Sequence, residues 1–297
     1  MKLKEKDVVE TLDNIYCGIL INYPNFKEGD MKTLVYDFSC PEYKELISKY
    51  HIDQVAGKGS DFLRAKRLLK YLSPRLTHKS NYDNHVNCNS LELLDYSFDN
   101  PNHGINCLNK SKILAECCLA LGIYARRVRI LPYSPYDFDN HVVTEIYERK
   151  MNKWIMLDPT TNGYFIDENK TPLSMLEIRN KFKNLELVTY LNVAKSLKDP
   201  KKLKEKYYSL NNYICKNSFC LALEEYNGFG EKSGALHFIP EGYSLTNNQI
   251  INAEFRLKNL PSELKTKYAK YLKERIEKLK GCCDEPIDIS VLIKRPY

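Results

Sequence analysis

A chain of 297 residues with 43% hydrophobic residues is long enough to bury a substantial core, and it predicts one main domain with appendages rather than two equal domains. The net charge of +7 comes from 45 Lys and Arg against 38 Asp and Glu; because the excess is spread thinly along the chain, it disfavours a nucleic-acid partner. No uncharged apolar run approaches the ~20 residues that a membrane span requires. Residues 1–20 contain charged side chains at the positions where a secretory signal needs an apolar core. A cytoplasmic protein without a membrane partner is therefore expected.

The first part of the chain is predicted to hold one strand followed by helices. Residues 32–38 alternate apolar and polar side chains, as a strand does, and residues 41–49 are typical of a helix. A longer helix is expected to begin at an N-cap, Ser60 or Asp61, and to end before Pro74, because its apolar residues recur at the 3.6-residue period.

A polar segment separates this helix from the most informative one. Residues 77–103 are rich in Asn, Ser, Asp and His and are predicted to be loop, apart from a short helix over 90–96. The next helix begins near Asn106 or Cys107, carries apolar side chains on its buried side, and ends at Gly122, a residue suited to the position after a helix C-cap.

Three alternating segments then predict a sheet. They cover residues 127–133, 141–147 and 153–157, and a turn over 149–152 joins the last two. One helix followed along the chain by three neighbouring strands predicts an α+β fold, in which an antiparallel sheet packs on the helix that starts at Cys107.

The C-terminal third of the chain carries no recognisable motif. A lysine-rich run over 195–206 is expected to be a solvated helix or a linker. Strands are predicted over 213–224 and 234–239, and an amphipathic helix over 262–280. This third could extend the core sheet, cap an active-site cleft or mediate oligomerisation, and the sequence does not choose among these roles.

These elements predict three parts of the chain. An N-terminal α/β extension, residues 1–59, packs on a catalytic core of residues 60–190, and a C-terminal α+β extension covers residues 191–297.

The ten cysteines predict neither a metal site nor a disulfide framework. No C-x-x-C pair occurs, and the nearest metal-like fragments, His85 to Cys88 and Cys215 to Cys220, have no second half at zinc-finger spacing. In a chain without an export signal, most of these cysteines are expected to be reduced thiols, several of them in the core. No cofactor is expected.

Three residues of the predicted core have the order and setting of a cysteine acyl-transfer site. Unpaired N–H groups and the macrodipole at the first turn of a helix favour a thiolate at Cys107, and a neighbouring imidazolium favours it further. His141 begins one strand of the predicted hairpin and Asp158 follows the other, so antiparallel pairing makes them neighbours. The sequence therefore predicts Cys107 as nucleophile, His141 as general base and Asp158 as the residue that orients the imidazole.

Four stretches together resemble the transglutaminase-like superfamily of papain-related cysteine enzymes. They are the G-x-x-C opening of the helix at 104–107, L-G-I-Y-A-R-R-V at 121–128, N-H-V-V-T-E-I-Y at 140–147 and K-W-I-M-L-D-P-T at 153–160. The resemblance is to a divergent member of bacterial type, and it implies a papain-like core and acyl transfer or hydrolysis of amides through a Cys107 thioester. Asn106, Tyr124 and Val142 depart from the family's usual residues, so the resemblance does not imply a substrate class.

Further residues are candidates for an oxyanion hole or a substrate rim. The backbone amides of the helix start and the side-chain amides of Asn89, Asn106 and Asn140 are donors that could complete an oxyanion hole, and the sequence does not choose among them. Tyr136 belongs to the loop before His141, which is either a substrate rim or a solvated connection.

An aromatic residue on the last predicted strand is also a candidate. Trp154 is interpreted as either a core residue or part of the substrate rim.

Two functions remain open at this stage. The first is a transglutaminase-like cysteine protease, amidase or acyltransferase that acts on a protein or peptide. The second is a catalytically idle domain of the same fold that binds a peptide or protein partner. An arylamine-type acetyltransferase shares the order of Cys, His and Asp, but the sequence lacks a glycine loop for the phosphates of a thioester donor. The oligomeric state is not predicted.

Overall fold

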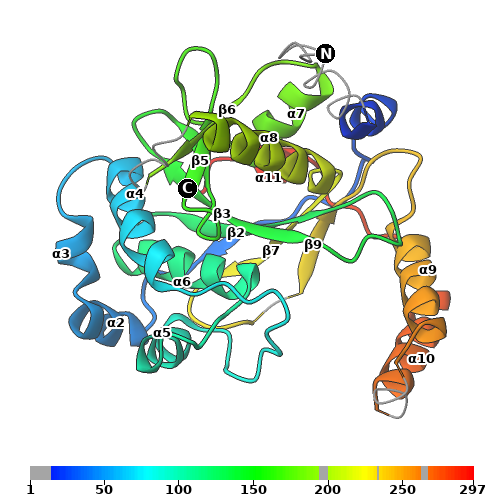
Figure 1. Cartoon of the computed structure of the whole chain (residues 1–297), viewed down its shortest axis with the longest axis horizontal. Helices are drawn as coiled ribbons and strands as arrows, with labels where there is room; N and C mark the ends of the chain where they lie inside the picture. Colours follow the sequence, from blue (N-terminus) through cyan, green and yellow to red (C-terminus); the bar gives the residue numbers. More distant parts are fainter. Residues whose placement is uncertain (1–14, 194–199, 233, 262–266) are drawn as a thin grey trace.

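The structure is a computed structural model of the chain that describes residues 15–193, 200–232, 234–261 and 267–297, and their side chains except those of 200–208 and 267. A five-stranded antiparallel sheet with the order β4-β3-β2-β7-β9 lies at its centre (Figure 1). The strands of this sheet are β2 (Ala125–Leu131), β3 (His141–Glu148), β4 (Lys153–Leu157), β7 (Cys220–Glu224) and β9 (Ala235–Phe238). Two strand pairs lie outside it: the parallel pair β1 (Val35–Tyr36) and β8 (Tyr226–Asn227), and the antiparallel pair β5 (Gly163–Ile166) and β6 (Thr189–Asn192).

Helices cover both faces of the central sheet, so the fold has three layers (Figure 1). One layer contains α2 (Glu42–Tyr50), α3 (Ile52–Ala56), α4 (Asp61–Leu72) with a 3-10 turn after it (Ser73–Arg75), α5 (Ser90–Asp99) and α6 (Cys107–Ala120). The opposite layer contains the helical residues 15–22, α7 (Met175–Lys183), α8 (Pro200–Asn217) and α11 (Ser290–Ile293). The helices α9 (Leu245–Lys258) and α10 (Lys267–Lys280) form a hairpin at one end of the molecule, with a small core of its own.

Strand β3 separates the two hydrophobic cores, because successive side chains of a strand point to opposite faces. Ile146 packs in the core that contains α6, and Val143 packs in the core on the other face. Hydrogen bonds tie α6 to this strand: the Ser111 hydroxyl donates to the carbonyl of Val142 at 2.8 Å, and the Thr144 hydroxyl donates to the carbonyl of Ser111 at 3.1 Å. The N-terminus of α6 is therefore held beside the start of β3.

The structure confirms the expected mixture of helices and antiparallel sheet, with α6 packed on that sheet. Helix α4 has the predicted cap, since the Ser60 hydroxyl accepts from the backbone N–H of Leu63 at 3.4 Å. Gly122 follows α6 with a φ of +74°, a conformation that glycine adopts without strain. The predicted strand over 32–38 is shorter in the structure, where only Val35–Tyr36 pair with another strand.

The C-terminal third differs more from the sequence-based expectations. The strand predicted over 213–224 is wrong in its first half, because residues up to Asn217 belong to α8 and only Cys220–Glu224 form β7. The strand predicted over 234–239 is confirmed as β9, and the helix predicted over 262–280 is observed from Lys267. The predictions for residues 195–199 and 262–266 lie outside the described residues. The helical residues 15–22 and the helices α3, α7, α9 and α11 were not predicted.

The C-terminal third also completes the central sheet. Strand β7 pairs with β2 through Leu131 and Cys220, and β9 pairs with β7 on its other side. Extension of the sheet was one of the roles that the sequence left open for this part of the chain.

Candidate active site

Cys107 is the first residue of α6 and is half-buried. The preceding residue, Asn106, caps the helix: its side-chain oxygen accepts from the backbone N–H of Asn109 at 3.2 Å. Helix geometry leaves the N–H groups of Cys107 and Leu108 without an acceptor inside the helix. The sulfur of Cys107 therefore lies beside free amide donors and at the positive end of the helix dipole.

The segment before Cys107 is held against residues 77–79. Ile105 exchanges backbone hydrogen bonds of 3.0 Å with both Thr77 and Lys79. A Cβ atom at Gly104 would lie 2.7 Å from the Cβ of Lys79, closer than side chains pack, so this approach requires glycine. The glycine of the G-x-x-C stretch thus fixes the path by which the chain reaches the nucleophile candidate.

His141 and Asp158 meet as the predicted hairpin requires. His141 is the first residue of β3 and Asp158 follows the last residue of β4. The Nε2 atom of His141 lies 3.0 Å from Oδ2 of Asp158, and the two side chains are 2% and 1% exposed. The other oxygen of Asp158 accepts from the backbone N–H groups of Thr160 and Thr161, at 2.8 and 3.3 Å.

The charges of this pair favour an imidazolium. Burial lowers the pKa of His141, but the charge of Asp158, their hydrogen bond and a hydrogen bond with Cys107 outweigh burial and raise it to about 10. Burial raises the pKa of Asp158, but the charge of His141 and hydrogen bonds from His141, Thr161 and Thr160 outweigh burial and lower it. An ionised carboxylate only accepts, so Nε2 donates to Asp158 and Nδ1 is the nitrogen left to face Cys107. At neutral pH a protonated histidine stands between a carboxylate and a thiol.

Helix α8, from the C-terminal third, covers His141. The ring of Tyr213 lies edge-on to the imidazole with centroids 5.3 Å apart, and its hydroxyl donates to Asp139 at 3.1 Å. Lys216, one turn later, forms ion pairs with Asp137 at 2.9 Å and Asp139 at 3.5 Å. These contacts hold the loop that enters β3 against α8 and shield the imidazole from solvent.

Sequence reasoning missed these two α8 residues. The i, i+3 spacing of Tyr213 and Lys216 marks one face of a helix, but this segment was predicted to be a strand. It also missed the buried Lys110, whose i, i+3 spacing from Cys107 on the predicted helix was the available signal.

Two of the three asparagines that were candidates for the oxyanion hole cap helices instead. Asn89 caps α5: its side-chain oxygen accepts from the N–H of Glu92 at 2.9 Å, and its side-chain nitrogen donates to the Glu92 carboxylate at 3.0 Å. Asn106 caps α6 and donates to the side-chain oxygen of Asn84 at 3.0 Å. The structure therefore assigns Asn89 and Asn106 to helix capping and corrects their prediction as oxyanion-hole donors.

Asn140 and Tyr136 lie in the loop that leads to His141. Asn140 precedes the histidine directly, is exposed, and forms no side-chain hydrogen bond with any residue that the structure describes. Tyr136 is 58% exposed and packs edge-on against Phe255 of α9 with centroids 5.1 Å apart. Of the rim candidates, Asn140 is the one beside the site with a free amide.

Trp154 lies away from these residues, which corrects its prediction as a rim aromatic. It pairs with Tyr147 near the far end of β3, four residues along the chain from Asp158. Its side chain is 3% exposed, its indole N–H donates to the carbonyl of Lys294 at 3.1 Å, and the guanidinium of Arg126 lies 3.7 Å from its ring centroid. Trp154 is a core residue.

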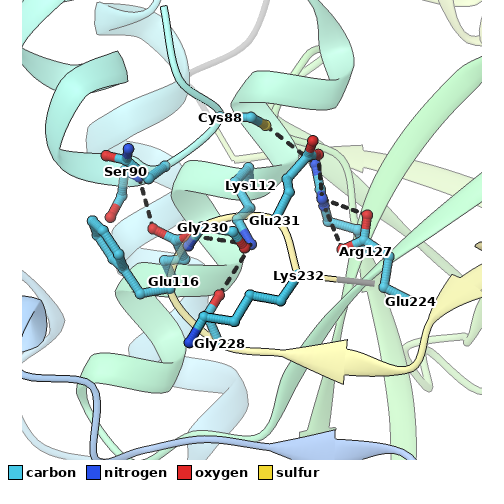
Figure 2. A network of polar contacts seen from close by, with 12 residues as sticks. Cys88, Ser90, Lys112, Glu116, Arg127, Glu224, Gly228, Gly230, Glu231 and Lys232 are labelled. Carbon is cyan, nitrogen blue, oxygen red and sulfur yellow. Dashed lines mark hydrogen bonds and ion pairs between the residues drawn. The ribbon is translucent and has the colours of Figure 1, made fainter. Parts of the chain in front are cut away.

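A buried polar network anchors the middle of α6 (Figure 2). The Glu116 carboxylate accepts from the backbone N–H groups of Ser90 at 2.7 Å and Gly230 at 2.9 Å. It also pairs with Lys112 at 3.1 Å, and Lys112 donates in turn to the carbonyls of Gly228 and Gly230. The network thus bonds α6 to α5 and to the loop after β8.

The same loop is tied to the sheet by a second group of contacts (Figure 2). Arg127 of β2 pairs with Glu224 of β7, and with Glu231 at 2.9 Å. Arg127 also donates to the sulfur of Cys88 at 3.4 Å, and that thiol donates to the side chain of Asn109 at 3.3 Å. Because Asn109 is in the first turn of α6, these contacts help to fix the position of Cys107.

Comparisons with known proteins do not assign this chain to a family: no protein-family model matches it, and neither does any curated protein. Within the described ranges, no group of three or more His, Cys, Asp and Glu side chains is arranged to hold a metal ion. No described helix is long and apolar enough to cross a bilayer.

Proposed function

We propose that this protein is a cysteine hydrolase or acyltransferase that acts on amide bonds of a protein or peptide through a thioester on Cys107. The observation that carries the proposal is the His141 imidazole, which is hydrogen-bonded to Asp158 at 3.0 Å and lies near Cys107, the first residue of α6, whose thiol acts with Asp158 to raise the histidine pKa. An imidazolium in this position favours the thiolate, which is the nucleophilic form of cysteine.

The reaction follows from this geometry in two steps. In the first, the Cys107 thiolate forms a bond to the amide carbonyl carbon, and the first-turn N–H groups of α6 stabilise the oxyanion that results. His141 gives its proton to the amide nitrogen as the C–N bond breaks, so an amine leaves and a thioester remains. In the second, water or an acceptor amine attacks the thioester and gives its proton to His141, and the S–C bond breaks to restore the thiolate.

Asp158 has a positioning role in both steps. It accepts from Nε2 of His141 and keeps Nδ1 toward the sulfur, and its charge stabilises the imidazolium in each resting state. The two backbone N–H groups that bind its other oxygen restrict its rotation.

We further propose that the chain is a divergent member of the transglutaminase-like superfamily with a papain-like core. The G-x-x-C stretch at the start of α6 and the hairpin that joins His141 to Asp158 support this proposal. Cys117 and Cys118 of α6 are buried free thiols, which is typical of a reducing compartment and supports a cytoplasmic site of action.

The test compares the wild-type protein with Cys107→Ala, and with Cys282→Ala as a matched change at an exposed cysteine. Peptide and protein amides are incubated with each variant, and products and acid-quenched acyl-enzyme are measured by mass spectrometry. We expect turnover and an adduct on Cys107 in the wild type and in Cys282→Ala, and neither in Cys107→Ala.

A labelling assay provides a readout that needs no substrate. At about pH 6, where an ordinary thiol is almost wholly protonated, iodoacetamide should alkylate Cys107 much faster than Cys282. Equal rates at the two cysteines, or turnover that survives in Cys107→Ala, would contradict the proposed function.

A further inference from the structure

Lys110 is a buried lysine without a partner among the residues that the structure describes. It lies one turn after Cys107 on α6 and is 2% exposed, yet it forms no hydrogen bond or ion pair with any described residue. Lys112, two residues later and 3% exposed, has the acceptors that a buried ammonium usually has: it pairs with Glu116 and donates to two backbone carbonyls. The two lysines therefore differ in the availability of their ammonium groups.

Lys110 lies three residues after Cys107 on α6, so the two residues are neighbours along the helix surface. Burial lowers the pKa of Lys110 to about 8, while the charges of Asp158 and Cys107 act in the opposite direction, so both groups lie near it. Its own charge, after burial, lowers the pKa of His78, which is in the segment that runs beside the start of α6. Helical side chains lean toward the helix N-terminus, so the Lys110 side chain extends over the turn that carries Cys107.

The residues around Lys110 leave its charge without an acceptor. The carboxylate of Asp158 is already bound by His141, Thr160 and Thr161. The ammonium donates to no described residue and the side chain is 2% exposed, so water, or a ligand that reaches it, is left as its acceptor. Together with the positive end of the α6 dipole, this free cation makes the space beside Cys107 suited to an anion.

We propose that Lys110 binds a carboxylate of the acyl donor, so that the preferred substrate is an amide of an acidic acyl group. The proposal rests on the proposed function of Cys107 and names its substrate class. Cβ atoms at i and i+3 on a helix are about 5–6 Å apart, so a carboxylate on Lys110 is within a few bonds of a carbonyl on the Cys107 sulfur. A glutamyl or aspartyl residue on the acyl side has this spacing.

The test uses two alkylating reagents that differ only in charge. Iodoacetate and iodoacetamide both form an S–C bond with a thiolate and release iodide, and only iodoacetate carries a carboxylate. The rate constants at Cys107 are measured by mass spectrometry at about pH 7 and divided by those at the exposed Cys282 of the same molecules. We expect the iodoacetate-to-iodoacetamide ratio to be higher at Cys107 than at Cys282.

Two variants assign that preference to Lys110. In Lys110→Met, which keeps the length of the side chain and removes the buried charge, the ratio should fall about tenfold, the usual size of a hydrogen bond to a charged group. In Lys44→Met, a matched loss of charge at an exposed position of α2, the ratio should not change. An unchanged ratio in Lys110→Met overturns the proposal, because His141 would then account for the whole attraction.

A second measurement needs no variant. N-acetylglutamate α-amide and N-acetylglutamine α-amide differ by one carboxylate, and the first should slow the alkylation of wild-type Cys107 by iodoacetamide at concentrations where the second does not. Equal effects of the two compounds also overturn the proposal. Failure of the proposed function is distinguishable, because iodoacetamide alone would then alkylate Cys107 no faster than Cys282.

Discussion

Replacement of Asp158 by Asn tests the charge arrangement of the site directly. The Asp158 carboxylate lies 3.0 Å from Nε2 of His141, and an attraction between unit charges at this distance is about 5 kcal/mol at an effective dielectric constant of about 20. The rise in the His141 pKa from 6.5 to about 10 corresponds to a similar free energy, about 5 kcal/mol. Without the carboxylate, burial prevails, and the pKa of His141 should fall below 6.5.

The expected result is a loss of Cys107 reactivity at mildly acidic pH. In Asp158→Asn the imidazole is less protonated at pH 6 than in the wild type, so its support for a thiolate at Cys107 is weaker. An ordinary thiol, with a pKa of about 8.5, is about 0.3% ionised at pH 6. The rate constant for alkylation of Cys107 by iodoacetamide at pH 6 should therefore fall toward that of an ordinary thiol and recover as the pH rises above about 8.

The matched control is Asp167→Asn. Asp167 also accepts from two backbone N–H groups, those of Asn169 at 2.9 Å and Thr171 at 2.8 Å, but it has no histidine partner among the described residues. This variant should react at the wild-type rate. Circular dichroism would show whether Asp158→Asn is folded. If the folded variant also reacts at the wild-type rate at pH 6, the imidazolium does not control the reactivity of Cys107 and the reasoning is refuted.

Three further predictions concern stability, each measured by urea unfolding. The pKa of His141 is raised on folding, so its contribution to the free energy of unfolding is fully present below about pH 6.5 and is lost as the pH rises through about 10. The stability difference between wild type and His141→Gln should accordingly shrink toward pH 10, and a constant difference would contradict the assigned pKa. Glu116→Gln leaves the buried Lys112 without its carboxylate and should cost about 3 kcal/mol, a loss that an exposed pair would not produce. Asn106→Ala removes the cap of α6 and should cost about 1 kcal/mol, whereas Asn106→Ser, which keeps a capping oxygen, should restore most of it.

The sequence alone determined the parts of the site that depend on neighbours along the chain. A cap is set by residues three positions apart, so Ser60 and the start of α4 were predictable. A short hairpin fixes which strand ends face each other, so the contact between His141 and Asp158 was predictable without knowledge of the rest of the fold.

Local sequence patterns did not predict the structure where contacts between residues far apart in the chain determine it. The run from Tyr213 has the aromatic and apolar composition of a strand, but its first residues form the end of α8, since packing against the second core overrides intrinsic preference. Trp154 was expected in the core or at the rim, and only the register of β4 with β3 shows that it lies at the far end from the site.

The sequence by itself therefore determined that His141 meets Asp158, and the tertiary structure decided what surrounds them. Only the packing of α8 on the loop before β3 places Tyr213 over His141. Likewise, Lys112 has Glu116 four residues later on α6 and Lys110 has Leu114 there, but only the tertiary structure brings the carbonyls of a loop more than a hundred residues away to Lys112 and no acceptor from the described residues to Lys110. The physical reason is that the helix period predicts which side chains are buried and which neighbours on the same helix they can meet, whereas acceptors from another part of the chain depend on which segment packs against the helix.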